Sequence, residues 1–310
     1  FKQKTAYEIP KRDWSSDVCS SDLQWIAVVD ADYVVSPDWL RAVAGHFDDP
    51  ATVVVQCPQA HRDWRGSRLA RMMNFEFDSF FRIGMHHRAA RNALVQHGTM
   101  TLVRREALQA TGGWDADCIC EDTELGLRLL RAGGRVVYVD EVLGTGLLPA
   151  DFAAYQRQRR RWAQGGMQIL RKHGAALLRR GDLRFAQRAH FVAGWLPWFA
   201  DALHLVFSAV AVVWTAGALL APRWFELPTP TLAFALLGAY VARWGMSLAL
   251  HLRCVTPRPA DALGAVVAAI ALSHAVACGV FKGLLQRRAV FYITRKASTG
   301  GDTPTATAAP

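Results

Sequence analysis

Short apolar runs separated by polar, helix-periodic segments fill the first half of this chain. Four runs have the length and composition of strands: 24–29, 51–56, 96–103 and 136–139. Continuous apolar runs of this length are typical of strands buried on both faces, and we expect 24–29 to be a buried parallel strand. Segments with helical spacing follow the runs. This alternation predicts an α/β layered domain.

Helices are expected between these strands. One begins at Ser36, which caps it, with Pro37 in the first helical position. Another covers 67–91 and carries a stripe of phenylalanines, which we assign to the core rather than to a ligand platform. A third opens at Glu121 and ends at Gly133, because glycine suits the residue after a helix.

The last third of the chain predicts membrane helices. Segments 203–220 and 231–252 are apolar and long enough to span the hydrocarbon, whereas 262–285 is richer in Ala and Gly. Basic residues precede the first segment and follow the second and third. Because basic residues prefer the cytoplasmic side, two spans with the third segment in the interface place every basic cluster inside, and we favour that count over three spans.

The two ends differ from the rest. Residues 1–23 have no helical or strand periodicity and resemble translated adapter sequence, so we expect the amino-terminal part of the domain to be missing. Residues 299–310 are small and polar and are expected to be disordered. We therefore expect a cytoplasmic domain over 24–188, a membrane region over 189–286 and a cytoplasmic tail over 287–310.

Charge and cysteine usage narrow the function classes. The 310 residues carry a net charge of +10 at a mean hydropathy of +0.09, and arginines concentrate between 157 and 188. Such a cluster could bind nucleic acid. Its place before the apolar segments instead favours the cytoplasmic flank of membrane helices, facing anionic lipids. None of the six cysteines has CxxC spacing, which excludes a zinc ribbon and a disulfide framework.

Two carboxylates follow the first predicted strand. Asp30 and Asp32 stand at its carboxyl end, where open α/β sheets bind their ligands. A hard divalent cation is held by one or two carboxylates together with phosphate oxygens. The pair therefore predicts a nucleotide and metal site, and a pair that caps the loop is the structural alternative.

A second acidic pair, Glu121 and Asp122, opens a helix. The helix dipole favours acidic residues in the first turn, so capping alone is one explanation. A positioned carboxylate can instead take the proton from an attacking hydroxyl group.

A basic helix follows the acidic one. Its residues Gln158, Arg161 and Trp162 share one face. A basic amphipathic helix lying on lipid would explain the arginines, but not Gln158 and Trp162 together.

These motifs, in this order and followed by apolar segments, resemble the family 2 glycosyltransferases of the membrane-embedded, processive cellulose synthase-like type. Asp30-Ala31-Asp32 resembles the DxD motif, Cys120-Glu121-Asp122 the TED motif with Cys for Thr, and residues 158–162 match QxxRW. The resemblance implies an α/β GT-A domain, Rossmann-like and nucleotide-sugar-binding, followed by transmembrane helices.

The resemblance also implies roles on the donor side. Asp32, together with Asp30, would contact Mg²⁺ or Mn²⁺ and the nucleotide, and Arg161 would face the diphosphate. Residues 291–296 resemble the FxVTxK gating loop with Ile for Val, which would bring Thr294 and Lys296 to the nucleotide-sugar.

On the acceptor side, the resemblance makes Asp122 the catalytic base. Residues implied to bind the acceptor are Gln158, Trp162, Glu121, His97 and Gly98. His97 and Gly98 stand where cellulose synthase has a Cys-Gly-Ser turn, so the His departs from the family and leaves the acceptor open.

The implied function is an inverting glycosyltransferase that moves a sugar from a nucleotide-sugar, expected to be a UDP-sugar, to a growing polysaccharide at a bacterial inner membrane. Transfer of one sugar to a lipid carrier is the alternative enzyme. A non-catalytic membrane transport or scaffold protein is a further class, favoured by Arg243 within an apolar segment. Membrane lipids are expected partners and nucleic acid is not.

Overall fold

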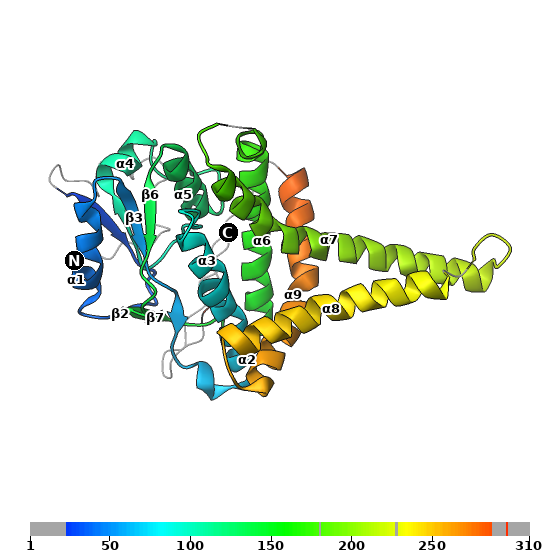
Figure 1. Ribbon diagram of the computed structural model, residues 1–310. Helices are drawn as coiled ribbons and strands as arrows, with labels where there is room; N and C mark the ends of the chain where they lie inside the picture. Colours follow the sequence, from blue (N-terminus) through cyan, green and yellow to red (C-terminus); the bar gives the residue numbers. More distant parts are fainter. Residues whose placement is uncertain (1–22, 180, 227–228, 287–295, 297–310) are drawn as a thin grey trace, which may run out of the picture.

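The computed structural model describes residues 23–286, except 180 and 227–228, together with residue 296. A sheet lies at one end with helices packed against it, and two long helices project away from the other end (Figure 1). The predicted α/β domain followed by apolar helices is confirmed by this arrangement.

The larger sheet positions the acidic motifs. Its described strands are β1 (Trp25–Val28), β3 (Thr52–Gln56), β5 (Thr101–Arg104) and β6 (Arg135–Tyr138), in the order β1-β5-β3-β6. β5 is antiparallel to β1 and β3, whereas β3 and β6 are parallel. β1, β3 and β6 therefore point the same way, and their carboxyl ends meet the amino end of β5 at one edge.

The segments that leave this edge form a smaller sheet. It consists of β2 (Val34–Val35), β7 (Gly144–Gly146) and β4 (Ala60–His61), in the order β2-β7-β4. β7 is antiparallel to β2 and parallel to β4. The loop after β1 is therefore attached to the segments that follow β3 and β6.

β1 is not the buried parallel strand that its apolar sequence predicts. It pairs antiparallel with β5 and has no second neighbour among the described residues. Trp25 is 36% exposed and Val29 is 37% exposed. The prediction was wrong because an apolar run reports hydrophobicity, while strand direction is set by pairing with segments distant in sequence.

Two element boundaries also differ from the prediction. α1 (Trp39–Ala44) begins after Asp38 rather than at Pro37, and Asp38 makes no side-chain cap. β5 occupies only the end of the predicted strand 96–103. Met100 has a φ of 53°, and this left-handed conformation interrupts an extended backbone.

Helices cover the larger sheet. α2 (Arg68–Ser79) passes through a π-helical turn (Phe80–Met85) into α3 (His86–Ala89). Phe77 and Phe81 are buried, which confirms that this segment belongs to the core. The remaining elements of the domain are α4 (Arg105–Ala110), α5 (Glu121–Arg131), α6 (Phe152–Leu178) and two short 3-10 turns, Gly45–Asp48 and Trp64–Gly66.

One buried carboxylate fixes α5 to α6. Glu124 is fully buried and accepts hydrogen bonds from Arg128 Nε at 2.7 Å, Lys172 Nζ at 2.9 Å and His173 Nε2 at 2.8 Å. Burial by itself raises the pKa of Glu124, but these hydrogen bonds outweigh it and lower the pKa to about 2. Glu124 lies two residues after Asp122, so it anchors the start of α5, with its acidic motif, to the basic helix α6.

Three long helices follow. α7 (Phe185–Leu220) and α8 (Pro230–Cys254) form the projecting pair, and α9 (Pro259–Leu285) lies along α6 (Figure 1). A Cβ atom at Gly279 of α9 would lie 2.4 Å from the Arg160 carbonyl oxygen, and one at Gly283 would lie 2.5 Å from that of Gln164. These glycines let α9 approach the backbone of the basic helix directly.

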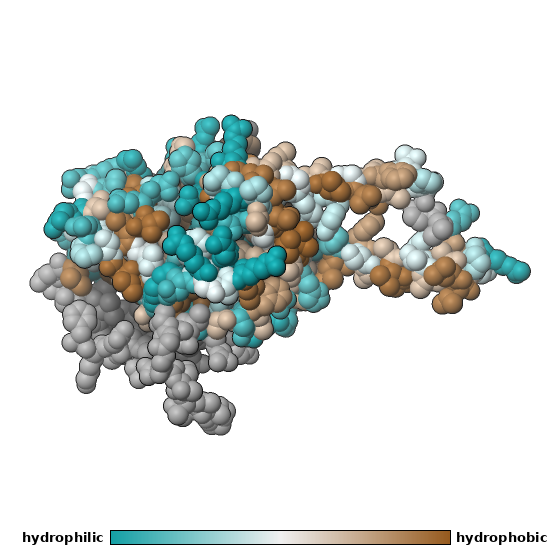
Figure 2. Space-filling model, turned by 90° about the horizontal axis from the view of Figure 1, so that it is seen from below, coloured by the Kyte–Doolittle hydropathy of each residue, from teal (hydrophilic) through white to brown (hydrophobic). Residues whose placement is uncertain are grey.

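All three helices are long and apolar enough to cross a membrane. The apolar stretches of α7 and α8 are 0% buried, whereas that of α9 is 50% buried inside the protein. Hydrophobic residues are visible along the projecting pair (Figure 2). Phe191 and Trp195, near the start of α7, are buried.

Replacing the buried carboxylate tests the anchor between α5 and α6. We expect Glu124→Gln to lower the free energy of unfolding by about 3–5 kcal/mol, because it leaves the largely buried Arg128 guanidinium without its counter-charge. Denaturant unfolding in detergent measures this change. Glu106→Gln, at an exposed position on α4, is the control and should stay within about 0.5 kcal/mol of the parent.

The same variant has a pH signature. The folded-state pKa of Glu124 lies below its ordinary value of 4.5, so the stabilisation is present above that pH and is lost as the pH falls toward 2. The stability difference between parent and Glu124→Gln should shrink across this window. A difference that stays constant down to about pH 2 would contradict the ion-pair account.

Candidate functional site

Contacts at both acidic residues hold the loop after β1. The Asp30 N–H donates to Thr99 Oγ1 at 2.9 Å, which ties the loop to the turn before β5. Asp32 Oδ2 accepts the Leu147 N–H at 2.8 Å and lies 3.3 Å from Lys296 Nζ. Lys296 also donates to the Leu147 carbonyl at 3.0 Å. Asp32 therefore joins the loop to two segments far along the chain.

The turn before β5 brings its backbone against Asp122. A Cβ atom at Gly98 would lie 3.2 Å from Asp122 Oδ2, so a side chain there would push on that carboxylate. Asp122 Oδ1 accepts the Thr123 N–H at 2.7 Å, and the Thr123 hydroxyl donates to the Gln96 carbonyl at 2.9 Å. The glycine turn and the acidic motif form one unit, which helix capping alone does not predict.

Burial and like charge raise the pKa values of these carboxylates. Desolvation, together with the charge of Asp122, raises the pKa of Glu121 to about 7, against the attraction of Arg161. Desolvation also raises the pKa of Asp122, against backbone hydrogen bonds and the attraction of Arg161. Asp30 contributes to the raised pKa of both residues. The loop after β1 and the start of α5 are therefore within electrostatic reach of each other.

Two cations from distant parts of the chain face this carboxylate cluster, defined as Asp30, Asp32, Glu121 and Asp122. Arg161 of α6 lowers the pKa of Asp30, Glu121 and Asp122. Lys296 lowers the pKa of Asp30 and forms the ion pair with Asp32. The structure thus brings together four motifs that the sequence separates.

Oxygen atoms of the cluster suit a hard divalent cation. Among the described residues, no group of three or more His, Cys, Asp or Glu side chains could hold a metal by itself. Mg²⁺ or Mn²⁺ bound by two carboxylates plus phosphate oxygens and water needs no such group. No hydrogen bond to the Asp30 carboxylate is present among the described residues, and Asp32 Oδ2 already faces a cation in Lys296. The residues present fit the expected metal.

His97 supports the glycine turn. Its ring is buried, with Nδ1 at 2.8 Å from the Thr99 carbonyl oxygen and its edge against Phe81 at a centroid distance of 5.3 Å. Burial lowers the pKa of His97 to about 4, so the ring is neutral near pH 7. Contact of His97 with an acceptor stays a prediction.

The predicted residues of α6 are packed into the domain. Gln158 is buried and Trp162 is half-buried. The Trp162 ring is tilted against Phe77 with ring centroids 5.7 Å apart, and the Arg159 guanidinium lies 4.7 Å from the indole centroid. Gln158 and Trp162 are therefore not simply one face of a helix lying on lipid.

The cysteine that replaces Thr in the acidic motif packs against α6. Cys120 is the residue before α5, and its side chain makes no capping hydrogen bond. A Cβ atom at Gly165 would lie 2.3 Å from Cys120 Sγ, so the glycine makes room for the thiol. Cys120 therefore contributes a packing contact between the start of α5 and α6.

Sequence reasoning missed the residues that hold the motifs in place. Arg62 donates from Nη1 to the Asp32 carbonyl at 2.7 Å and fixes the acidic loop. Glu76 of α2 pairs with Arg159 and accepts the Tyr155 hydroxyl hydrogen bond. Arg159 lies inside the QxxRW match and could have been singled out there. Nothing in the sequence pattern marks Glu76 or Arg62.

Thr294, predicted to contact the nucleotide, lies outside the described residues. Lys296 of the same segment is described, and its pairing with Pro149 as an isolated β-bridge brings it beside Asp32.

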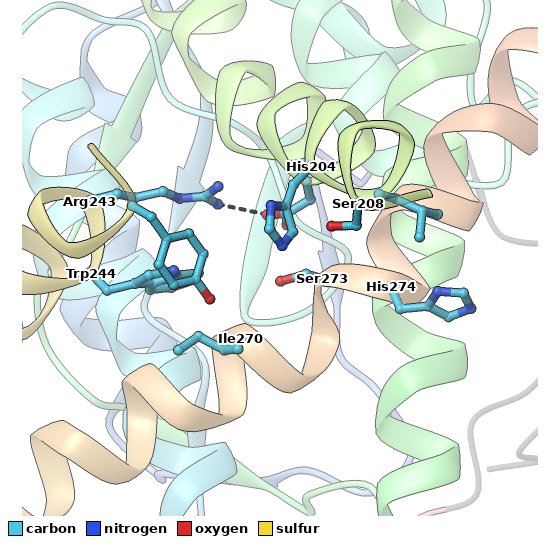
Figure 3. A pocket seen from close by; sticks show the side chains of 10 residues that line it. His204, Ser208, Arg243, Trp244, Ile270, Ser273 and His274 are labelled. Carbon is cyan, nitrogen blue, oxygen red and sulfur yellow. Dashed lines mark hydrogen bonds and ion pairs between the residues drawn. The ribbon is translucent and has the colours of Figure 1, made fainter. Parts of the chain in front are cut away.

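A separate pocket, lined in part by polar residues, lies among α7, α8 and α9. Its volume is about 240 Å³, and it shares no residue with the carboxylate cluster. Arg243 Nη2 donates to Asp201 Oδ1 at 2.6 Å, the contact dashed in Figure 3. Other polar lining residues are His204, Ser208, Tyr240, Trp244, Ser273 and His274. Arg243, the charged residue within the apolar stretch of α8, is therefore paired with Asp201 on α7.

Two similar relatives are plant proteins. One is the probable glucomannan 4-beta-mannosyltransferase 7 of Oryza sativa subsp. japonica, 29% identical over 171 residues, which are 54% of this chain and 29% of that protein. Another is the probable glucomannan 4-beta-mannosyltransferase 1 of Arabidopsis thaliana, 30% identical over 150 residues, which are 48% of this chain and 27% of that protein. The chain thus spans less than a third of the length of these relatives.

Among solved structures, the mannosyltransferase PcManGT from Pyrobaculum calidifontis in complex with GDP-Man and Mn²⁺ is similar over 84% of this chain and 62% of that one. The TM-score is 0.49 and the sequence identity is 18%.

The family match covers the whole carboxylate cluster and the basic helix. Residues 25–246 match the family described as Glycosyl transferase family group 2. This stretch contains Asp30, Asp122 and Trp162, so all three principal motifs lie within it. The chain belongs to glycosyl transferase family group 2.

Proposed function

We propose that this protein is an inverting glycosyltransferase that moves a sugar from a nucleotide-sugar to a hydroxyl group of a polysaccharide. The observation that carries the proposal is the setting of Asp122. This carboxylate is desolvated, has a raised pKa, lies against the turn at Gly98 and is within electrostatic reach of Asp30. A proton acceptor beside a cation-binding pair suits displacement of a diphosphate by a hydroxyl group.

Asp122 is the base in the proposed reaction. The acceptor oxygen attacks the anomeric carbon of the donor, the bond from that carbon to the diphosphate breaks, and the hydroxyl proton passes to Asp122. A single displacement inverts the configuration at that carbon. The raised pKa makes Asp122 a stronger proton acceptor, and a positioned base contributes typically ~10²–10⁴-fold.

The donor side of the site combines the two aspartates after β1 with two cationic side chains. Asp30 and Asp32 would hold Mg²⁺ or Mn²⁺ together with the diphosphate, and such a metal would supply positive charge to neutralise the leaving group. Arg161 and Lys296 add positive charge beside the same carboxylates. Contact of Thr294 with the nucleotide belongs to this proposal.

The acceptor side lies toward α6. Trp162 offers an aromatic ring for a sugar, Gln158 a hydrogen-bonding amide, and Glu121 a second carboxylate beside the base. The turn at His97 and Gly98 borders this side. Such a surface suits a growing polymer that stays bound between transfers.

Two classes of donor are candidates: UDP-sugars and mannose nucleotide-sugars. The sequence favours a UDP-sugar, whereas the relatives' names specify mannosyl transfer. A mannose nucleotide-sugar such as GDP-mannose therefore belongs beside UDP-sugars in any donor panel.

We place the protein in a bacterial inner membrane with the sheet domain in the cytoplasm. α7 and α8 would span the bilayer because their apolar stretches are exposed, and α9 would lie in the interface because half of its stretch is covered by the domain. The arginines between 157 and 188 then face the cytoplasm and anionic lipids.

The alternatives have less support. Transfer of one sugar to a lipid carrier uses the same site and differs in its product, a labelled lipid instead of a polymer. A transport protein was favoured by Arg243, but its ion pair with Asp201 gives that charge a structural role between helices. Nucleic acid remains outside the proposal.

Nucleotide release from a donor panel tests the proposed chemistry. In membranes carrying the protein expressed from its complete gene, we expect release from one UDP-sugar or from GDP-mannose. Asp122→Asn should reduce kcat by roughly 10²–10⁴-fold, because the hydroxyl proton loses its acceptor. Asp38→Asn, at an exposed carboxylate of the same domain, should leave kcat unchanged. Equal release by parent and Asp122→Asn would contradict the assignment.

Metal titration tests the donor side. A chelator should abolish nucleotide release, and added Mn²⁺ or Mg²⁺ should restore it. Asp32→Asn should raise the half-saturating metal concentration by about tenfold or more. Even the loss of a residue that only hydrogen-bonds to a metal ligand typically lowers metal affinity by about that factor. The Asn amide oxygen can still accept the Leu147 N–H, so the loop is retained. An unchanged metal requirement in Asp32→Asn would remove this carboxylate from the metal site.

A further inference from the structure

The position of Trp162 depends on contacts that begin on another helix. Glu76 Oε2 of α2 accepts hydrogen bonds from the Tyr155 hydroxyl and from Arg159 Nη2, both on α6. The Arg159 guanidinium then lies 4.7 Å from the Trp162 ring centroid and 5.3 Å from that of Phe77. The indole thus packs against a cation whose own place is fixed by Glu76.

This ion pair is largely shielded from water. The side chains of Glu76 and Arg159 are 16% and 15% exposed, and Tyr155 is 1% exposed. Removing two charges from water is costly, and apolar side chains of similar volume often stabilise a core equally well. Stability alone therefore gives no reason for charges here, whereas a planar guanidinium held by a carboxylate fixes an orientation.

The guanidinium limits how the indole can turn. It lies over one face of the Trp162 ring, which leaves the opposite face for a sugar, and the Phe77 ring is tilted by 50° against the same indole. A sugar ring binds an aromatic side chain through its face, so its affinity depends on the plane in which that face is held. Two residues therefore fix the ring plane of Trp162: Phe77, which belongs to α2, and Arg159, which is held by Glu76 of α2.

We propose that Glu76 is a positioning residue that sets the ring plane of Trp162 through Arg159 and so determines affinity for the acceptor sugar. The inference rests on the proposed function, because it takes Trp162 as the acceptor contact. Glu76 itself touches neither the carboxylate cluster nor Lys296 in the described structure. Its loss should therefore act on the acceptor and leave the donor side intact.

The same helix supplies a matched control. Arg71 of α2 forms an ion pair with Asp261 of α9 at 2.7 Å, and its guanidinium lies over Trp64 rather than Trp162. Asp261→Asn therefore breaks a partly buried ion pair of α2 without disturbing the contact to Trp162.

Steady-state kinetics with β-1,4-linked mannohexaose and cellohexaose as acceptors test the proposal. Glu76→Gln preserves the shape of the side chain and removes the charge that holds Arg159. We expect acceptor KM to rise about tenfold, while donor KM and kcat at saturating acceptor stay within about twofold. Asp261→Asn should leave acceptor KM unchanged.

A second pair of variants separates positioning from folding. Arg159→Lys keeps the ion pair but loses the planar group beside the indole, so it should show the same acceptor defect as Glu76→Gln. If Glu76→Gln does not fold, the double variant Glu76→Gln with Arg159→Met removes both buried charges and should fold with acceptor KM still raised.

The outcomes distinguish the inference from the proposed function. Unchanged acceptor KM in folded variants, or an equal rise in Asp261→Asn, would overturn the positioning role while transfer by the parent continues. No sugar transfer from any donor by the parent protein would overturn the proposed function and the positioning role together.

Discussion

The convergence of four carboxylates at one edge of the sheet is the constraint around which this protein is arranged. Asp30, Asp32, Glu121 and Asp122 come from two distant segments, and desolvation and mutual repulsion raise the pKa values of three of them. Such a cluster needs positive charge nearby. Arg161 arrives on α6 and Lys296 from the end of the described chain, and a divalent cation with a diphosphate would complete the balance.

Buried ion pairs outside this cluster hold the helices that carry it. Glu124 ties α5 to the carboxyl-terminal half of α6, and Glu76 ties α2 to the half that carries Trp162. Glycines let α9 pack on the backbone of α6 beside the same motif. The basic helix is therefore fixed on three sides, and the helices proposed to enter the membrane are connected to the site through it.

Much of the fold and the site could be predicted from sequence because the relevant signals are local. Apolar runs and helical spacing predicted the α/β domain, and the resemblance of the motifs to family 2 glycosyltransferases implied that Asp30, Asp122 and Arg161 belong to one site. The direction of β1 could not be predicted, since it depends on pairing with β5. Glu76 and Glu124 were missed because a charged side chain on a helix is usually solvated, and only tertiary packing buries these two.

Equilibrium binding of the nucleotide-sugar by Asp122→Asn, measured beside transfer, distinguishes the donor site from the base. In the proposed reaction, the cation-assisted donor site is distinct from the base that takes the acceptor proton. We therefore expect Asp122→Asn to bind the donor with Mn²⁺ at the parent Kd and to form the glycosidic bond roughly 10²–10⁴-fold more slowly in a single-turnover assay. Transfer at the parent rate, or loss of donor binding together with loss of transfer, would contradict that division of roles.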